Sequence, residues 1–139
     1  MKTPTSLVIA LFIGTAMSLT TSTAFAQAYL YDLLAKPSYS KSWNALFLDE
    51  KNVDAWLAKY SKTQDGPAMP GKQLKLGGAS YQINSVCKTH DCDRNMFYVL
   101  YAPNGAKAWG LLLKEGKSER FFGKPDEEQK NALRAAAKG

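Results

Sequence analysis

The sequence predicts an α+β fold in which an antiparallel sheet of about five strands carries helices packed on it. Apolar residues recur at helical spacing across residues 29–60, and they alternate with polar residues at 74–76 and 81–85. Residues 96–101 are rich in aromatic and β-favouring residues, and short turns separate these segments. Residues 125–137 then have the composition of a final helix. Strands joined by short turns must run antiparallel. The order of helices, strands and one helix therefore indicates a meander sheet that helices cover.

Length and composition restrict the function classes. The chain has 139 residues, of which 45% are hydrophobic and 22% charged, values typical of a globular protein. Two cysteines and one histidine are too few for a four-ligand zinc site, a c-type haem or an iron–sulfur cluster. The sequence contains neither of the glycine-rich phosphate-binding motifs GxGxxG and GxxxxGK(S/T). We therefore expect no cofactor and no metal, and a small binding module in preference to a multi-step enzyme.

Residues 1–26 are typical of a secretory signal peptide. Lys2 gives a positive start, Leu7–Met17 form an uncharged apolar run, and Ala24–Ala26 fit the small-residue cleavage pattern. The run is shorter than the ~20 residues that a membrane-spanning helix needs. We expect cleavage to leave one domain, residues 27–139, with no membrane association. An exported chain enters an oxidising compartment, which favours a disulfide between its two cysteines.

The charge pattern does not favour a nucleic-acid partner. Loss of Lys2 leaves 17 of the 18 basic side chains against 12 acidic ones, a net charge of +5. The lysines are scattered from Lys36 to Lys138 with no run of four, whereas nucleic-acid-binding surfaces cluster their cations. We expect a solvated surface of interspersed charge.

Three helical segments are expected before the sheet. Tyr29–Leu34 form one or two turns that Pro37 ends, since the residue before a proline avoids the α region. Ser40 or Ser42 caps a second segment. Asn52 caps the third, whose apolar period is the clearest in the sequence. The apolar positions of the second and third segments are Trp43, Leu46, Phe47, Val53, Trp56, Leu57 and Tyr60.

Turn residues separate the expected strands. Residues 63–71 are expected to form a loop because they hold two prolines and two glycines. Asn104-Gly105 accepts the positive φ angles that tight hairpins need. Pro125 opens the final helix at its first position, with Asp126–Glu128 near the positive end of the helix dipole. The expected strands are residues 74–76, 81–85, 96–101, 108–114 and 119–122.

The segment that carries chemistry joins two expected strands and runs from Cys87 to Cys92. A disulfide between its ends holds their Cα atoms about 5.5 Å apart, whereas the extended stretch spans roughly 17 Å. The four middle residues must therefore bulge outward, displaying Lys88, His90 and Asp91. Closing so short a ring stabilises a fold by only about 2 kcal/mol. Ordering the loop before it meets a partner is the stronger reason for the bridge.

Two interpretations of this loop remain open on the residues alone, a protruding recognition loop and a structural staple of a hairpin. A zinc site lacks ligands, because a disulfide consumes both thiolates. A redox site of the CxxC type needs two residues between its cysteines, and four stand here. A Cys–His nucleophile pair needs a free thiol and a cleft. A small enzyme that uses His90 and Asp91 is a third hypothesis.

An exported α+β chain with a Cys-Lys-x-His-Asp-Cys loop resembles the Ivy family, the bacterial inhibitors of vertebrate (c-type) lysozyme. The similarity also extends through residues 29–47 and the aromatic strand before Pro103. The resemblance implies helices on both sides of the sheet in three layers, frequent homodimers, and an inhibitor that is not an enzyme. Its implied partner is c-type lysozyme, whose active-site cleft the loop enters and blocks without any chemistry.

Carried to this sequence, the resemblance makes Cys87 and Cys92 the staple of a lysozyme-binding loop. Lys88 and Asp91 are implied as flanking contacts, and His90 as the central residue that hydrogen-bonds the two lysozyme carboxyls. One of those carboxyls is protonated with a raised pKa while the other is ionised. An imidazole has two ring nitrogens and so engages both groups at once.

This chain departs from the family pattern inside and beside the loop. Thr89 stands where the family has proline, so the lysozyme-binding loop loses a fixed φ angle and gains a hydroxyl. Asp93 and Arg94 stand where glycine and aspartate are expected, and glycine adopts backbone angles that aspartate adopts less readily. Animal c-type lysozymes are generally basic, as this chain is, so binding must rest on short-range fit.

The sequence thus predicts a periplasmic inhibitor of c-type lysozyme that protects the cell wall of a Gram-negative bacterium from host defence. The alternative is a periplasmic glycan-binding or envelope-maintenance module of the same fold that no longer inhibits lysozyme, with aromatic side chains as stacking surfaces. Such a platform needs exposed aromatic rings. Trp43, Trp56 and Trp109 lie at apolar-periodic positions, which predicts that they pack in the core.

Overall fold

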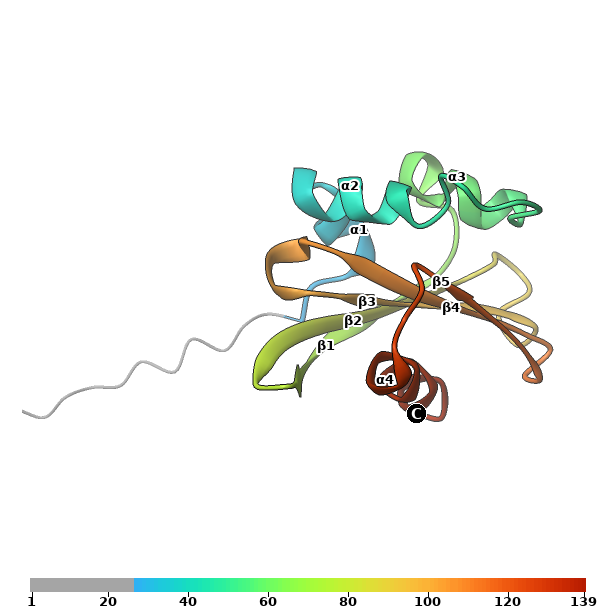
Figure 1. Ribbon diagram of the computed structural model, residues 1–139. Coiled ribbons are helices and arrows are strands. Elements are labelled where there is room, and N and C mark those ends of the chain that lie inside the picture. The colour runs from blue at the N-terminus through green and yellow to red at the C-terminus, as the bar shows by residue number, and fades with distance from the viewer. Residues whose placement is uncertain (1–26) are drawn as a thin grey trace, which may run out of the picture.

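The computed structural model describes residues 27–139 and contains a five-stranded sheet. The predicted signal peptide, residues 1–26, lies outside the described residues. The strands follow chain order and each pairs antiparallel with the next, so the sheet is a meander (Figure 1). The strands are β1 (Ala68–Leu76), β2 (Ala79–Cys87), β3 (Asn95–Tyr101), β4 (Ala108–Lys114) and β5 (Ser118–Phe122).

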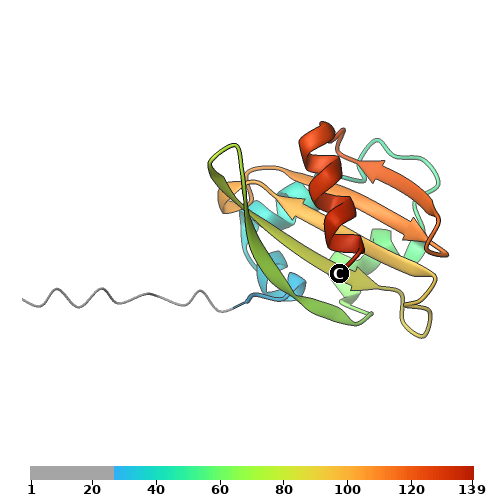
Figure 2. The same ribbon diagram turned by 90° about the horizontal axis from the view of Figure 1, so that it is seen from below.

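Helices cover both faces of the sheet, which gives the molecule three layers (Figures 1 and 2). One face carries α1 (Leu30–Leu34), α2 (Pro37–Ala45) and α3 (Ala55–Thr63), and α4 (Glu127–Ala137) crosses the other. The predicted α+β class and its antiparallel sheet are confirmed. Among the described residues, none of the helices is both long enough and apolar enough to cross a lipid bilayer.

The sheet buries a separate apolar cluster on each face. Successive side chains of a strand point to opposite faces, and β3 shows the result: Phe97 and Val99 pack against α1–α3, while Leu100 packs toward α4. Trp43 lies in the first cluster and Trp109 in the second, with 0% and 6% of their surfaces exposed. The prediction is confirmed for Trp43 and Trp109, and Trp56 is partly buried against the first cluster.

The prediction that Ser40 or Ser42 caps the second helix is wrong. α2 begins at Pro37, so both serines lie inside the helix. Proline suits the first helical position because its fixed φ is already helical. An N–H group at that position would have no partner within the helix, so its absence costs nothing. The Ser42 hydroxyl instead donates a 3.0 Å hydrogen bond to the Gly105 carbonyl, which ties α2 to the β3–β4 connection.

The prediction that Asn52 caps the third helix is also wrong. Asn52 has a φ of 57°, and α3 begins at Ala55 after Asp54. Arg120 of β5 donates a 2.9 Å hydrogen bond to the Asn52 carbonyl, and Lys114 of β4 pairs with the Asp54 carboxylate at 2.9 Å. These contacts come from strands that are distant in sequence, so the local pattern does not contain them.

The prediction that residues 63–71 form a loop is wrong in part. β1 begins at Ala68 and includes Pro70, and its register with β2 shifts between Met69 and Lys72. β1 is an edge strand, and proline is tolerated at an edge or a bulge because no partner there needs its N–H.

The predicted start of the final helix shifts by two residues. Asp126 is the N-cap of α4: its carboxylate accepts from the Gln129 backbone N–H at 2.8 Å, and the Gln129 side chain accepts from the Asp126 N–H at 2.9 Å. This reciprocal capping box begins the helix. Pro125 precedes the cap instead of opening the helix.

Gly110→Ala in β4 is expected to destabilise the fold by about 1–3 kcal/mol, the usual cost of overpacking a core. A Cβ atom at Gly110 would collide with the ring of Phe97, which is fully buried. Chemical denaturation measures the loss. Phe97→Leu in the same chain makes room, so the double variant is expected to lose less than the two single losses added together. Equal denaturation midpoints for Gly110→Ala and the wild type would contradict this packing.

Candidate functional site

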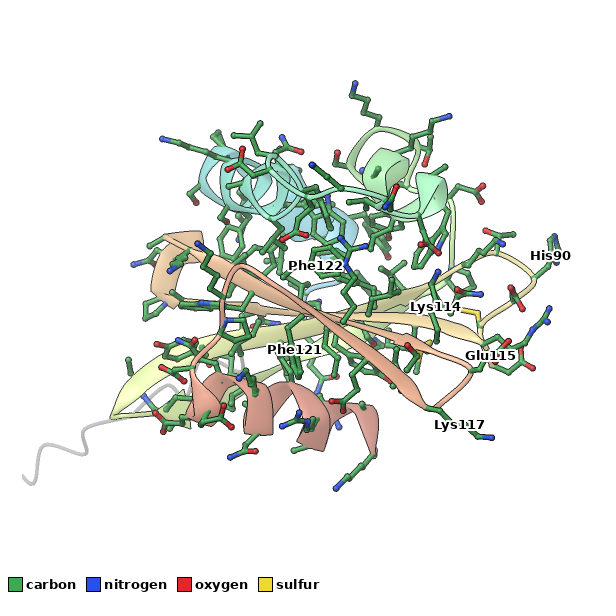
Figure 3. All side chains as sticks on the ribbon, turned by 45° about the vertical axis from the view of Figure 1, so that its right-hand side comes forward. His90, Lys114, Glu115, Lys117, Phe121 and Phe122 are labelled. Atoms are coloured by element: carbon green, nitrogen blue, oxygen red, sulfur yellow. A yellow bond between two sulfur atoms is a disulfide. The ribbon has the colours of Figure 1, made fainter. Side chains whose placement is uncertain are left out.

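The disulfide loop projects from one end of the sheet, where β2 ends and β3 begins. Cys87 and Cys92 form a disulfide with their Cα atoms 4.8 Å apart, so the predicted bulge is present. Figure 3 shows His90 at the tip of the loop, pointing away from the sheet, with Glu115 and Lys117 of the β4–β5 turn at the same end of the molecule. The Glu115 backbone N–H donates a 2.8 Å hydrogen bond to the Arg94 carbonyl. The β4–β5 turn therefore supports the loop from one side.

The four residues inside the disulfide ring form a β-turn. The Asp91 N–H donates to the Lys88 carbonyl at 3.0 Å, and His90, the third residue of the turn, has a φ of 61°. A left-handed third residue after a second residue with negative φ is the pattern of a type II turn. For a residue with a Cβ this conformation costs about 1–2 kcal/mol. It persists only where surrounding structure holds it, as it often does at functional sites.

Asp91 holds the loop together from inside. One carboxylate oxygen accepts from Arg94 Nε at 2.8 Å and the other from Asn95 Nδ2 at 2.7 Å, while Lys88 Nζ lies 3.8 Å away. Burial is the largest single influence on the pKa of Asp91 and raises it. The hydrogen bond and charge of Arg94, with Asn95 and Lys88, outweigh burial, so the pKa of this carboxyl lies below its usual range.

In the structure Asp91 stabilises the loop itself, whereas the resemblance implied a contact with lysozyme. Both of its carboxylate oxygens are already bonded within the loop, and only 14% of the side chain is exposed. That Asp91 also contacts lysozyme beside His90 stays a prediction. Lys88 is exposed beside Asp91. Sequence reasoning missed Arg94 and Asn95 as partners, although the spacing of an acid and a base three residues apart was a usable signal.

The departures at Asp93 and Arg94 cost the loop no backbone strain. Between Cys87 and Asn95, His90 is the residue with a positive φ, so the position of Asp93 does not need the freedom of glycine. Arg94 supplies the charged partner of Asp91. The backbone freedom that glycine would give at the position of Asp93 is therefore not used by the loop.

Thr89 is held from outside the ring. Its hydroxyl donates a 2.7 Å hydrogen bond to the Asp65 carboxylate, which belongs to the linker between α3 and β1. No local pattern signals this contact, because 24 residues separate the two positions. Asp65 is therefore a site residue that sequence reasoning could not find.

The surroundings of the loop do not support the enzyme hypothesis built on His90 and Asp91. Three hollows on the described surface are lined by other residues, and none of these three includes a residue of 88–91. Residues 27–139 also contain no cluster of three potential metal ligands. Trp43 and Trp109 are buried and so are not available as a stacking platform for the glycan-binding alternative. What the site offers is an exposed imidazole on a closed loop whose backbone turn is hydrogen-bonded.

A family model described as inhibitor of vertebrate lysozyme (Ivy) matches residues 38–138. That range includes the whole sheet, α4 and the disulfide loop. The chain belongs to the Ivy family. Ivy is a family of inhibitors and not of enzymes, which confirms the resemblance drawn from the loop motif.

Curated relatives differ in their names and in the share of each chain that is matched. The inhibitor of vertebrate lysozyme of Pseudomonas aeruginosa is 33% identical over 99 residues, covering 71% of this chain and 62% of that protein. The inhibitor of vertebrate lysozyme of Escherichia coli K12 is 28% identical over 79 residues, covering 57% and 47%. An uncharacterised protein of Yersinia pestis is 31% identical over 80 residues, covering 58% and 49%. This Ivy-family chain thus spans 47–62% of the length of these relatives.

Arg94→Ala is expected to raise the pKa of Asp91, because the arginine's hydrogen bond and charge help to lower it. A carboxyl with a lowered pKa in the folded state contributes stability at neutral pH, and that contribution is lost as pH falls through the folded-state pKa. The variant is therefore less stable than the wild type at neutral pH, and the difference vanishes in strong acid. An NMR titration of the Asp91 side-chain carbon measures the shift.

Lys88→Ala is the matched control, since Lys88 also lowers the pKa of Asp91 but from 3.8 Å and without a close hydrogen bond. Its effect on the pKa is expected to be smaller than that of Arg94→Ala. Equal Asp91 pKa values in Arg94→Ala and the wild type would show that Arg94 does not hold the carboxylate in solution.

Proposed function

We propose that this protein inhibits vertebrate c-type lysozyme by inserting the Cys87–Cys92 loop, with His90 foremost, into the active-site cleft. The observation that carries the proposal is a closed, projecting loop with an exposed histidine at its tip, in a chain of the Ivy family. A relative that shares 33% of its residues over 99 positions is named for this inhibition. The loop blocks the cleft and needs no chemistry of its own.

The electrostatics of a lysozyme cleft suit an imidazole. Of the two catalytic carboxyls, one is kept protonated by an apolar environment and the other is ionised. The two ring nitrogens of His90 supply one hydrogen-bond donor and one acceptor in the neutral ring, or two donors in the charged ring. Either form pairs with a carboxyl and a carboxylate at once. Because His90 is exposed at a fixed turn position, these hydrogen bonds require little rearrangement of the inhibitor.

Order in the free loop supports tight binding. Fixing a flexible loop on binding costs free energy that a preformed loop does not lose again. Here the disulfide, the Lys88–Asp91 turn and the carboxylate of Asp91 all hold the loop before any partner arrives. The left-handed conformation of His90 is therefore already present in the unbound protein.

Long-range charge does not help this encounter. The full chain has a formal net charge of +6, and c-type lysozymes are also generally basic. Repulsion between like charges slows association and weakens as salt screens it. We therefore expect affinity to come from slow dissociation of a well-fitted loop, and the association rate to rise with salt concentration.

We further propose that the protein works in the periplasm of a Gram-negative bacterium. The support is the signal-peptide pattern of residues 1–26, together with a disulfide that fits an oxidising compartment. Blocking lysozyme there would protect the cell wall from host defence.

His90→Ala is expected to weaken lysozyme inhibition by about 30-fold or more, the range of a central hot-spot residue. The measurement is a titration of lysozyme against bacterial cell walls, with residual clearing activity recorded. His90→Asn is the companion variant, because asparagine tolerates the left-handed turn position, but its amide donor and acceptor share one carbon and do not reach as far as Nε2 of the imidazole. It is expected to keep the turn and still lose most of the inhibition. Full inhibition by His90→Ala would remove the imidazole from its assigned role.

Replacing both cysteines, Cys87→Ser with Cys92→Ser, is expected to weaken binding by about 10- to 30-fold while the chain stays folded. The ring contributes about 2 kcal/mol of loop ordering, and each 1.4 kcal/mol is a tenfold change in affinity. Calorimetry gives the dissociation constant, and circular dichroism checks the fold, which a core on each face of the sheet supports. An unchanged dissociation constant would mean that the bridge does not preorganise the site.

A further inference from the structure

We infer that Asp65 is a positioning residue for lysozyme binding: through its hydrogen bond to Thr89 it fixes the turn that presents His90. The inference rests on the proposed function, because it concerns how the same loop reaches its target. Asp65 is assigned no direct contact with lysozyme in this inference. It acts on the residue that precedes His90 in the turn.

The bond is short and charge-assisted. Thr89 Oγ1 lies 2.7 Å from Asp65 Oδ1, within the range of a hydroxyl donating to an ionised carboxylate. Such bonds are roughly twice as strong as those between neutral groups. Thr89 is half-buried and Asp65 is exposed, so the bond lies at the rim of the loop.

The linker that carries Asp65 is itself fixed against the base of the loop. Gly66 has a φ of 135° and packs so closely on the Cys87 carbonyl that any Cβ atom would collide with it. The Cys87 N–H donates to the Pro67 carbonyl at 3.0 Å. Asp65 N–H also donates to the Thr63 hydroxyl at 3.3 Å. The carboxylate therefore reaches Thr89 from a support that is joined to the ring at Cys87.

The turn needs this support at Thr89 in particular. The second residue of a type II turn requires a φ near −60°, which proline supplies covalently and threonine does not. The next residue, His90, is left-handed and exposed, so a rotation at Thr89 carries the imidazole with it. The bond to Asp65 supplies from outside the loop the restraint that a proline would supply from within the chain.

A double-variant cycle in lysozyme binding tests the inference. Thr89→Val removes the hydroxyl and keeps the side-chain shape, and Asp65→Ala removes the acceptor. Each is expected to weaken binding by about tenfold, and the double variant is expected to be no weaker than either single variant, because one bond is lost in all three. Thermal midpoints stay close to the wild-type value, since an exposed bond contributes little to global stability.

Rescue separates positioning from a merely structural role. Thr89→Pro in the Asp65→Ala chain is expected to restore affinity, because proline fixes the φ angle that the lost bond had restrained. Asp65→Asn keeps an acceptor oxygen and is expected to retain much of the affinity. Glu128→Ala is the control for the loss of one exposed carboxylate, on α4 at the opposite face of the sheet, and is expected to leave binding unchanged.

Amide hydrogen exchange distinguishes failure of this inference from failure of the proposed function. The Asp91 N–H closes the turn on the Lys88 carbonyl, and its exchange is expected to accelerate in Asp65→Ala whether or not lysozyme is the partner. If the wild type inhibits lysozyme and Asp65→Ala binds as tightly, the inference is wrong. If the wild type does not inhibit, the proposed function fails, and unchanged Asp91 exchange in Asp65→Ala would then overturn the positioning role as well.

Discussion

The closure of a small ring at the end of a rigid sheet is the constraint on which the proposed site depends. Cys87 is the last residue of β2 and still pairs with Met96 of β3, so the disulfide joins a fixed strand to the connection that follows it. With the Cα atoms of its cysteines 4.8 Å apart, the ring leaves its four middle residues room for a tight turn. That turn places His90 in the left-handed region, at the tip and in solvent.

Packing in the rest of the fold keeps the ring in place relative to the sheet. The sheet is packed on both faces, with Phe97 and Leu100 of β3 buried in opposite clusters. Two neighbours then hold the loop itself: the β4–β5 turn through the bond from Glu115 to Arg94, and the α3–β1 linker through the contact of Gly66 with Cys87. A loop supported on both sides loses little freedom on binding, which suits an inhibitor that acts by fit.

Periodic features were predictable from the sequence, and contacts between distant residues were not. The strand at 96–101, the bounds of β4 and the outward bulge of the ring follow from local rules, and the structure has all three. The caps of α2 and α3 were missed because Pro37 opens a helix and Arg120 fixes the turn at Asn52. Within the site, His90 came from a motif, while Asp65 lies 24 residues from its partner and no local pattern points to it.

In the proposed mechanism a preformed loop occupies the lysozyme cleft, with one inhibitor to each active site. A titration of active lysozyme with the oxidised mature protein, scored by clearing of bacterial cell walls, tests it most directly. Activity is expected to fall linearly and to end near one inhibitor per active site. Full activity at a large excess of inhibitor would contradict it, and would mean that the Ivy fold here presents its loop to a different partner.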